Sequence, residues 1–598
     1  MGPPNLPPHE IYWNLVKKAD KNFITFKQLP ICGSNLQKHY FQKALDPYTK
    51  LWKFQKDCRS ELVEAGVKRW EVGDIASRIA QIYHENYERS SDPRSLNDSF
   101  LFFEAILTRE YFKGGLSTSH SLDLVLVKKQ MRFLARFLIV CLLLNRRVFV
   151  DDLYKRLRSQ LDECKLFFPQ DTDFKEYEQL VREINRFLRA DTPFMNLRSL
   201  RYTPVLDSRP DSEEYVASLE AGAEKGLRLR GAILSSYHHN EVKFTEFTLD
   251  TFRMHQCLEW EPSGSFYRVS TGGPDVPGIV GSNLPANSRN IVLYRRSSAQ
   301  FLAVLATVCE DLPSDGILLV YLSAGKSSEA STVPAAHVPG NIQSLSIIAD
   351  MSLDSPIRSR NDSDAPVPHS SSRNVDDQDF GNGKGLWLGA GGNGDRDCIY
   401  PSDLIPFTRW PFFLIVDSDV SDMFKAGILT LAVQRTENGK ITAILLSPRP
   451  ALPSVHGVDF ARTRSGSQFT MFLTAPLQAF CSLLGISSQN IDRDMYNEAE
   501  DHLSLSMNEW GRNLAVPGSL GPVWTEVLGD PFLRRIVLRF LFCRAVIALY
   551  TPTSNTEEYI PQCLPPLPDS VLPRSPTSQS AVRRLANFFG VVNSFSFS

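Results

Sequence analysis

Residues 399–424, IYPSDLIPFTRWPFFLIVDSDVSDMF, decide how the rest of the chain is interpreted. The stretch begins as a proline-containing loop, continues as an apolar run from Phe412 to Val416, and then reads Asp417-Ser418-Asp419. An apolar run of this length that ends at small polar residues predicts a strand buried on both faces. Because ligands of open α/β sheets bind outside the carboxyl ends of such strands, Asp417 and Asp419 are the first candidates for chemistry.

Apolar runs on both sides of this stretch predict a sheet covered by helices. The strand-like runs are Ile291–Tyr294, Ile317–Leu322, Phe412–Val416, Ile428–Val433 and Ile441–Leu446. Helical patterns cover Ser298–Cys309, Ala475–Leu484, Asp492–Asn513 and Pro531–Tyr550. Alternation of this kind predicts a Rossmann-like α/β domain over residues 290–550. Residues 326–396 interrupt it, and their Ser, Asp, Gly and Pro content predicts a disordered insertion.

The first 200 residues follow a helical period instead. Ile75–Tyr87 and Ser95–Phe112 are predicted to form an antiparallel pair, with aromatic and small residues spaced as in a tetratricopeptide-like unit. No 34-residue period repeats cleanly, and ordinary core packing is the alternative interpretation of these residues. Residues 201–289 are predicted to hold a helix (Glu241–Glu261) and a linker, and residues 551–598 a Pro/Ser-rich tail with a short terminal helix.

Composition excludes several classes of protein. The 598 residues carry 65 Lys and Arg against 67 Asp and Glu, so no global positive field attracts nucleic acid. Ten cysteines form no C-x-x-C pair, and without an N-terminal signal peptide they favour a reducing compartment. Met131–Leu144 is apolar at 12 of 14 positions but is shorter than the ~20 residues that a spanning helix needs, so a buried bundle helix is predicted.

Two glycine motifs resemble nucleotide-binding loops but occur in the wrong context. Gly389–Gly394 matches G-x-G-x-x-G, yet it ends a low-complexity stretch and opens no helix. Gly325-Lys326-Ser327 follows a strand, but Val320 replaces the first glycine of a P-loop. His238-His239 has no helical partner with which to bind a metal. We therefore expect no cofactor and no small-molecule substrate.

The acidic pair is the best candidate for an enzyme. A strand followed by D-x-D resembles the start of a haloacid-dehalogenase phosphatase, in which one Asp attacks phosphorus beside Mg²⁺. Ser421 stands where that motif usually has Thr or Val, and no later Lys and acidic pair follows in order. We favour a solvated strand end at which Asp417 or Asp419 caps the next turn, and a magnesium-dependent phosphatase remains the alternative.

A locally basic helical stretch is the candidate for nucleic-acid binding. Arg132, Arg136, Arg146 and Arg147 fall within residues 132–147, and arginines on one helical face could follow the phosphates of a single strand. The simpler interpretation is the solvated face of amphipathic helices.

Several long strings in order along the chain carry a family resemblance. They are Leu51–Gln55, Val67–Ile79, Val140–Asn145, Val242–Glu246, Tyr400–Leu404, Pro406–Arg409, Ile415–Ser418 and Gly466–Thr470. Together they resemble the SCAI family, named for "suppressor of cancer cell invasion". The insertion at 352–394 has no counterpart that we recognise in that family.

The resemblance implies a non-enzymatic regulator that binds proteins in the nucleus. The alternative location is both the nucleus and the cytoplasm. Animal members are described as cofactors of a myocardin-related coactivator that repress serum-response-factor targets downstream of Rho signalling, and as factors in DNA double-strand break repair. The partners it implies are transcription coactivators or DNA-repair proteins. For the contact surface we expect the loop with Asp403 and Arg409, together with the arginines of residues 132–147.

Overall fold

The computed structural model describes residues 7–31, 33–112, 124–167, 173–191, 227–238, 241–258, 288–325, 385–389, 398–433, 442–448, 465–487, 491–516, 518 and 520–597. All structural statements below concern these residues. The predicted insertion at 326–396 therefore lies outside the described part of the chain, except for residues 385–389 at its end.

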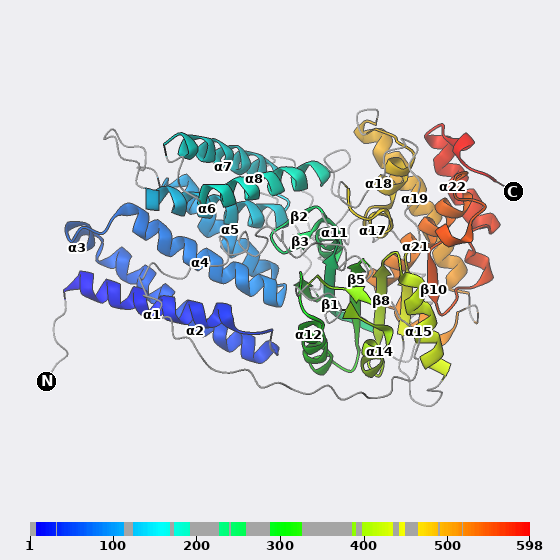
Figure 1. Ribbon diagram of the computed structural model, residues 1–598, viewed down its shortest axis with the longest axis horizontal. Coiled ribbons are helices and arrows are strands. Elements are labelled where there is room, and N and C mark those ends of the chain that lie inside the picture. Colours follow the sequence, from blue (N-terminus) through cyan, green and yellow to red (C-terminus); the bar gives the residue numbers. More distant parts are fainter. Residues whose placement is uncertain are drawn as a thin grey trace, which may run out of the picture.

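In the described part of the chain, eight helices form one end of the molecule (Figure 1). They are α1 (Pro8–Gln28), α2 (Ser34–Asp57), α3 (Arg59–Glu64), α4 (Arg69–Ser90), α5 (Pro93–Thr108), α6 (Leu124–Leu143), α7 (Arg147–Phe167) and α8 (Asp173–Ala190). Helices α4 and α5 pack together as predicted, because Ser91 adopts a left-handed conformation and the Asp92 side chain accepts a hydrogen bond from the Arg94 N–H. The tetratricopeptide-like assignment stays a prediction.

Helix α4 is shared between two cores because it has two apolar faces. Ile75, Ile79 and Ile82 pack against α1 and α2, whereas Ala76 and Ala80 belong to the core that α5, α6, α7 and α8 complete. Helix α6 contains all but the last residue of the apolar stretch Met131–Leu144 and is buried along most of its length, which confirms the predicted bundle helix. In the described part of the chain, we find no helix whose length and apolarity suit a membrane crossing.

A six-stranded sheet lies beside the helical part. Its strands are β1 (Arg228–Tyr237), β4 (Arg289–Leu293), β5 (Gly316–Ala324), β8 (Phe412–Asp417), β9 (Thr442–Leu446) and β10 (Gln562–Leu564). The order is β10-β9-β8-β5-β1-β4, and only β10 is antiparallel. Numbered by appearance, the parallel strands run 2-1-3-4-5, which is a doubly wound order with its switch point between β1 and β5.

Helices cover both faces of this sheet. Phe413 and Ile415 of β8 point into a core with α11 (Leu249–Leu258), α17 (Gln468–Thr474), α18 (Pro476–Leu483), α19 (Arg493–Leu514) and α21 (Pro531–Leu549). Phe412, Leu414 and Val416 point to the opposite core, which α12 (Ser298–Glu310), α14 (Pro401–Leu404) and α15 (Ser421–Val433) cover. The alternation of side chains along β8 explains why the whole run is apolar.

The structure corrects three predictions. Ile428–Val433, predicted as a strand, is the end of helix α15, because the parallel neighbours β8 and β9 require a crossover between them. The sheet also begins earlier than the predicted boundary at residue 290. Its strand β1 lies at Arg228–Tyr237, within the segment that we assigned to helix and linker. The predicted helix Glu241–Glu261 shortens to α11, because a hairpin of β2 (Lys243–Phe244) and β3 (Phe247–Thr248) precedes it.

The predicted tail and insertion also contribute to the folded core. Strand β10 extends the sheet, and helices α20 (Pro522–Leu528) and α22 (Pro576–Phe588) pack beside it. Trp524 donates a hydrogen bond to the Pro565 carbonyl at 3.1 Å, so residues after 550 are not a simple linker. At the end of the insertion, β6 (Leu386–Trp387) pairs with β7 (Cys398–Ile399).

Candidate functional site

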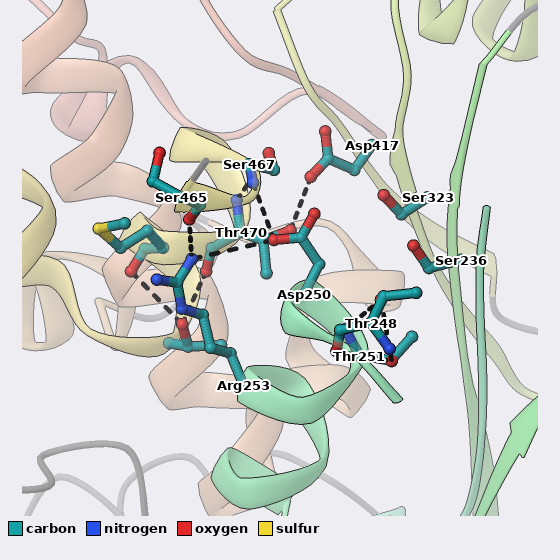
Figure 2. A network of polar contacts seen from close by, with 12 residues as sticks. Ser236, Thr248, Asp250, Thr251, Arg253, Ser323, Asp417, Ser465, Ser467 and Thr470 are labelled. Carbon is teal, nitrogen blue, oxygen red and sulfur yellow. Dashed lines mark hydrogen bonds and ion pairs between the residues drawn. The ribbon is translucent and has the colours of Figure 1, made fainter. Parts of the chain in front are cut away.

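Asp417 stands at the carboxyl end of β8, as the sequence predicted, but it is buried. The residue is 1% exposed and shares the face of Phe413 and Ile415. Figure 2 shows its carboxylate pointing toward α17, where the Thr470 hydroxyl donates a 2.6 Å hydrogen bond to Oδ2. The Thr470 hydroxyl is also 2.7 Å from that of Tyr321 on β5. Our expectation of a solvated strand end is therefore wrong for Asp417, because a later segment of the chain covers it.

That covering segment lies at the carboxyl ends of the strands, the edge of the sheet at which doubly wound proteins bind their ligands. The first turn of α17 faces Asp250, whose Oδ1 accepts a 2.8 Å hydrogen bond from the Ser467 N–H. Arg253 donates to the Ser465 carbonyl at 2.6 Å and lies 3.9 Å from Asp250 (Figure 2). Gly466 makes this approach possible: its φ is +74°, and a Cβ there would overlap the Asp250 carboxylate.

The switch point between β1 and β5 is covered as well. His238, just after β1, lies 3.1 Å from the Ser323 hydroxyl of β5. Trp387 of β6 packs edge-on against Tyr237 with ring centroids 5.0 Å apart, and its backbone N–H donates to the Gly325 carbonyl. The polar ends of these strands are therefore tied to protein groups in the described part of the chain.

Asp419 does not join Asp417. Its side chain is exposed, and its Oδ1 accepts a 3.3 Å hydrogen bond from the Ser418 hydroxyl. One carboxylate is thus packed in the core while the other faces solvent, which separates the two roles that a phosphatase needs. Among the described residues, no group of three His, Cys, Asp or Glu side chains could hold a metal ion.

The predicted basic face is largely engaged inside the protein. Arg136 is 8% exposed, and burial together with the charge of Arg132 lowers its pKa to about 10. Arg132 donates to the Tyr177 hydroxyl at 3.2 Å. Arg146 stacks over the Phe100 ring at 5.1 Å, and Arg147 donates to the buried Asp191 carboxylate at 2.5 Å. The role of these arginines in partner binding stays a prediction.

The two other predicted contact residues lie on the loop before β8. Asp403 accepts a 2.8 Å hydrogen bond from the Tyr400 N–H and thereby starts helix α14. Arg409 is exposed and stacks over the Trp410 ring at 4.4 Å. Arg409 is thus available to a partner, whereas the Asp403 carboxylate is hydrogen-bonded at the start of helix α14.

Comparison with known proteins decides the family. The model of the family described as "Protein SCAI" matches residues 14–553, which run from within α1 through the rest of the helical part and the five parallel strands described above. The chain belongs to the SCAI family. Mouse Protein SCAI is 31% identical over 583 residues, covering 97% of this chain and 88% of the mouse protein. Human Protein SCAI is also 31% identical, with the same coverage of both chains.

A more distant SCAI relative aligns over a similar share of the chain. The Protein SCAI homolog of Dictyostelium discoideum is 27% identical, covering 94% of this chain and 87% of that protein. No solved structure gives a significant match. The SCAI family match ends before strand β10 and helix α22, although both belong to the same folded core in this member.

A cavity that sequence reasoning missed lies between the two parts of this SCAI family member. It has a volume of about 310 Å³, and its walls come from α4, α6, β4 and the turn between β2 and β3. The one signal in the sequence was the helical spacing of Gln81, Glu85 and Glu88, which places three polar side chains on one face of α4. Nothing in the sequence indicated that Glu246 would meet this face.

Proposed function

We propose that this member of the SCAI family is a non-enzymatic nuclear regulator that acts by binding other proteins. Its proposed partners are a transcription coactivator of the myocardin-related type, whose serum-response-factor targets it would repress, and proteins of DNA double-strand break repair. Family membership over nearly the whole chain supports the regulator class.

One structural observation carries the non-enzymatic part of the proposal. The best acidic pair in the sequence is divided, with Asp417 hydrogen-bonded to Thr470 in the core and Asp419 on the surface. A reaction would need both carboxylates at an open site with room for a substrate. The same segment that buries Asp417 stabilises the α/β part, so these residues serve folding.

Purification with partners from nuclear extract tests the proposal. The tagged full-length chain should enrich transcription or repair factors over a tag-only control. The charge-reversing variant Arg409→Glu should lower that enrichment, because Arg409 is the exposed member of the predicted contact residues. Arg59→Glu on the exposed surface of α3 serves as the matched control. If the chain enriches neither class of factor, the proposal fails.

A phosphatase assay separates this proposal from the magnesium-dependent alternative. We expect no turnover of p-nitrophenyl phosphate with Mg²⁺ above the level of an Asp417→Asn variant. Turnover that is lost in both Asp417→Asn and Asp419→Asn would show that the protein is an enzyme.

A second candidate, single-stranded nucleic-acid binding, has a better location than residues 132–147. Helices α1 and α2 carry nine lysines against four carboxylates. Lys18, Lys21 and Lys43 line one hollow between them, together with polar side chains such as Asn22. Binding there should weaken steeply with salt, and Lys21→Gln should reduce the slope by about 0.7 if Lys21 contacts a phosphate. A flat salt response removes this candidate.

A further inference from the structure

The cavity between the helical part and the sheet has more basic than acidic side chains on its wall. The basic side chains are those of Lys27, Arg89, Arg136 and Arg296, and the acidic ones are those of Glu85, Glu88 and Glu246. Burial lowers the pKa of Arg136 only to about 10, so this arginine is still charged at neutral pH. The wall therefore carries an excess of positive charge even when all three glutamates are ionised.

The environment of the glutamates makes this excess larger. Loss of surrounding water raises the pKa of Glu85, although the charges of Arg89 and Lys27 oppose the shift. The same loss of water, and then the charges of Glu85 and Glu246, raise the pKa of Glu88 well above its usual range. Burial also raises the pKa of Glu246. Each shift favours the neutral carboxyl group, which competes less well for the basic side chains.

The ion pairs that line the cavity are long. The Arg89 Nε lies 4.0 Å from a Glu85 oxygen, and an Arg296 nitrogen lies 3.5 Å from a Glu246 oxygen. Charge-assisted N–H···O bonds usually measure about 2.7–2.9 Å between the same kinds of atom. The two guanidinium groups are therefore only loosely neutralised by these glutamates.

Buried nitrogens on the wall point to a ligand with acceptor oxygens. Asn290 of β4 is 2% exposed, and its Nδ2 has no hydrogen-bond partner among the described residues, although Oδ1 accepts a 2.7 Å bond from Ser288. In the same part of the chain, the buried Arg89 Nε and His84 Nε2 also lack hydrogen-bond partners. Amide and guanidinium nitrogens are donors, and a neutral imidazole donates from one of its nitrogens. Because buried polar atoms normally have partners, three such nitrogens in one cavity fit a ligand that accepts hydrogen bonds.

We propose that this cavity binds a small organic acid. The carboxylate of the acid accepts a hydrogen bond from the buried Asn290 amide, and its charge is balanced by the guanidinium groups of Arg89 and Arg296. The apolar body of the acid lies against side chains such as Phe103 and Phe247. The site goes beyond the proposed function and does not depend on it.

The size and polarity of the cavity define the class of acid. The volume of about 310 Å³ is at the lower end for small-molecule sites in proteins. Apolar side chains such as Ile139 and Leu293 form much of the remaining wall. A monovalent acid with an apolar body therefore fits the site better than inorganic phosphate, which has no group to place against that wall.

Calorimetric titration of the full chain at neutral pH tests this inference. The acid probes are phenylacetate and hexanoate, which carry an aromatic and an aliphatic body. Phenylacetamide has the same shape as phenylacetate without the charge, phenethylammonium carries the opposite charge, and inorganic phosphate is an anion without an apolar body. We expect at least one acid to bind at least about tenfold more tightly than each of the three other probes.

Variants identify the site. Arg296→Gln removes a charge from a side chain that is 44% exposed, so the fold should be kept and binding of the acid should weaken at least about tenfold. Asn290→Leu keeps the size of the side chain, removes the amide donor and should weaken binding as well. Glu88→Gln should not weaken it, because no negative charge is needed. Arg59→Gln, on the surface of α3, is the matched control. Thermal unfolding of each variant checks that the fold is kept.

Four results would overturn the assignment. They are the failure of both acids to bind the folded chain, equal binding of phenylacetamide or phenethylammonium, tighter binding of phosphate than of either acid, and binding by Arg296→Gln that matches the Arg59→Gln control.

Discussion

Replacing Asp417 by alanine should destabilise the protein strongly, whereas the same change at Asp419 should have almost no effect. The two residues are two positions apart, so sequence alone treats them as equivalent. In the structure, Asp417 is 1% exposed and accepts a 2.6 Å hydrogen bond from Thr470, while Asp419 faces solvent.

The magnitude follows from these contacts. A hydrogen bond to a charged group contributes about 1.5–3 kcal/mol, and the space left by the carboxylate adds to the loss. The Thr470 hydroxyl keeps its second contact with Tyr321 at 2.7 Å, so it is not left wholly without a partner. We therefore expect Asp417→Ala to lower the free energy of unfolding by about 3 kcal/mol, and Asp419→Ala by less than about 0.5 kcal/mol.

Urea unfolding followed by tryptophan fluorescence measures this difference, because Trp510 and Trp524 are buried in the same core as the Asp417 side of the sheet. A double-mutant cycle with Thr470→Val should give a coupling energy of at least about 1 kcal/mol. Equal effects of the two aspartate variants, or no coupling to Thr470, would refute the structural role of Asp417.

Local geometry gives three further predictions. Gly466→Ala should cost at least about 2 kcal/mol more than Gly590→Ala, measured by urea unfolding, because both have positive φ but only Gly466 has atoms within 4 Å of the place that a Cβ would take. The pKa of His84 is lower in the folded chain, so unfolding takes up a proton between pH 6.5 and about 4. The free energy of unfolding should therefore decrease as the pH is lowered through this range, and His84→Asn should abolish that part of the decrease. Arg147→Ala should lower the thermal midpoint by removing the cation beside the buried Asp191, at a cost of about 2–4 kcal/mol, and unchanged stability would contradict the pairing.

Much of the fold could be predicted because the local residue patterns match the burial that the tertiary structure imposes on each strand and helix. The runs that form β4, β5, β8 and β9 are largely apolar, as strands between two helical layers must be. The prediction failed at Ile428–Val433, where a short apolar run fits a helix as well as a strand. The prediction missed β1 because the apolar pattern at the start of this strand is interrupted by Arg228, Arg230 and Gly231. The central position of β1 in the sheet comes from its pairing with both β4 and β5.

The candidate sites show the same division between local and distant causes. The position of Asp417 at a strand end could be predicted, because a strand and the polar residues after it are neighbours along the chain. The burial of Asp417 could not be predicted, because Thr470 lies 53 residues away and nothing local specifies that contact. The same holds for the cavity, where Glu88 and Glu246 meet across elements that are far apart in the sequence.

The sequence by itself determined the family, the helical first part and the alternation of strands and helices that follows. These features depend on residue periodicity and on long strings of specific residues, which are properties of neighbours in the chain. The tertiary structure alone decided that one aspartate of the central stretch is a core residue, and that three glutamates surround a cavity between the two parts. Burial and charge depend on which distant segments pack together, since solvent is excluded only where the folded chain meets itself.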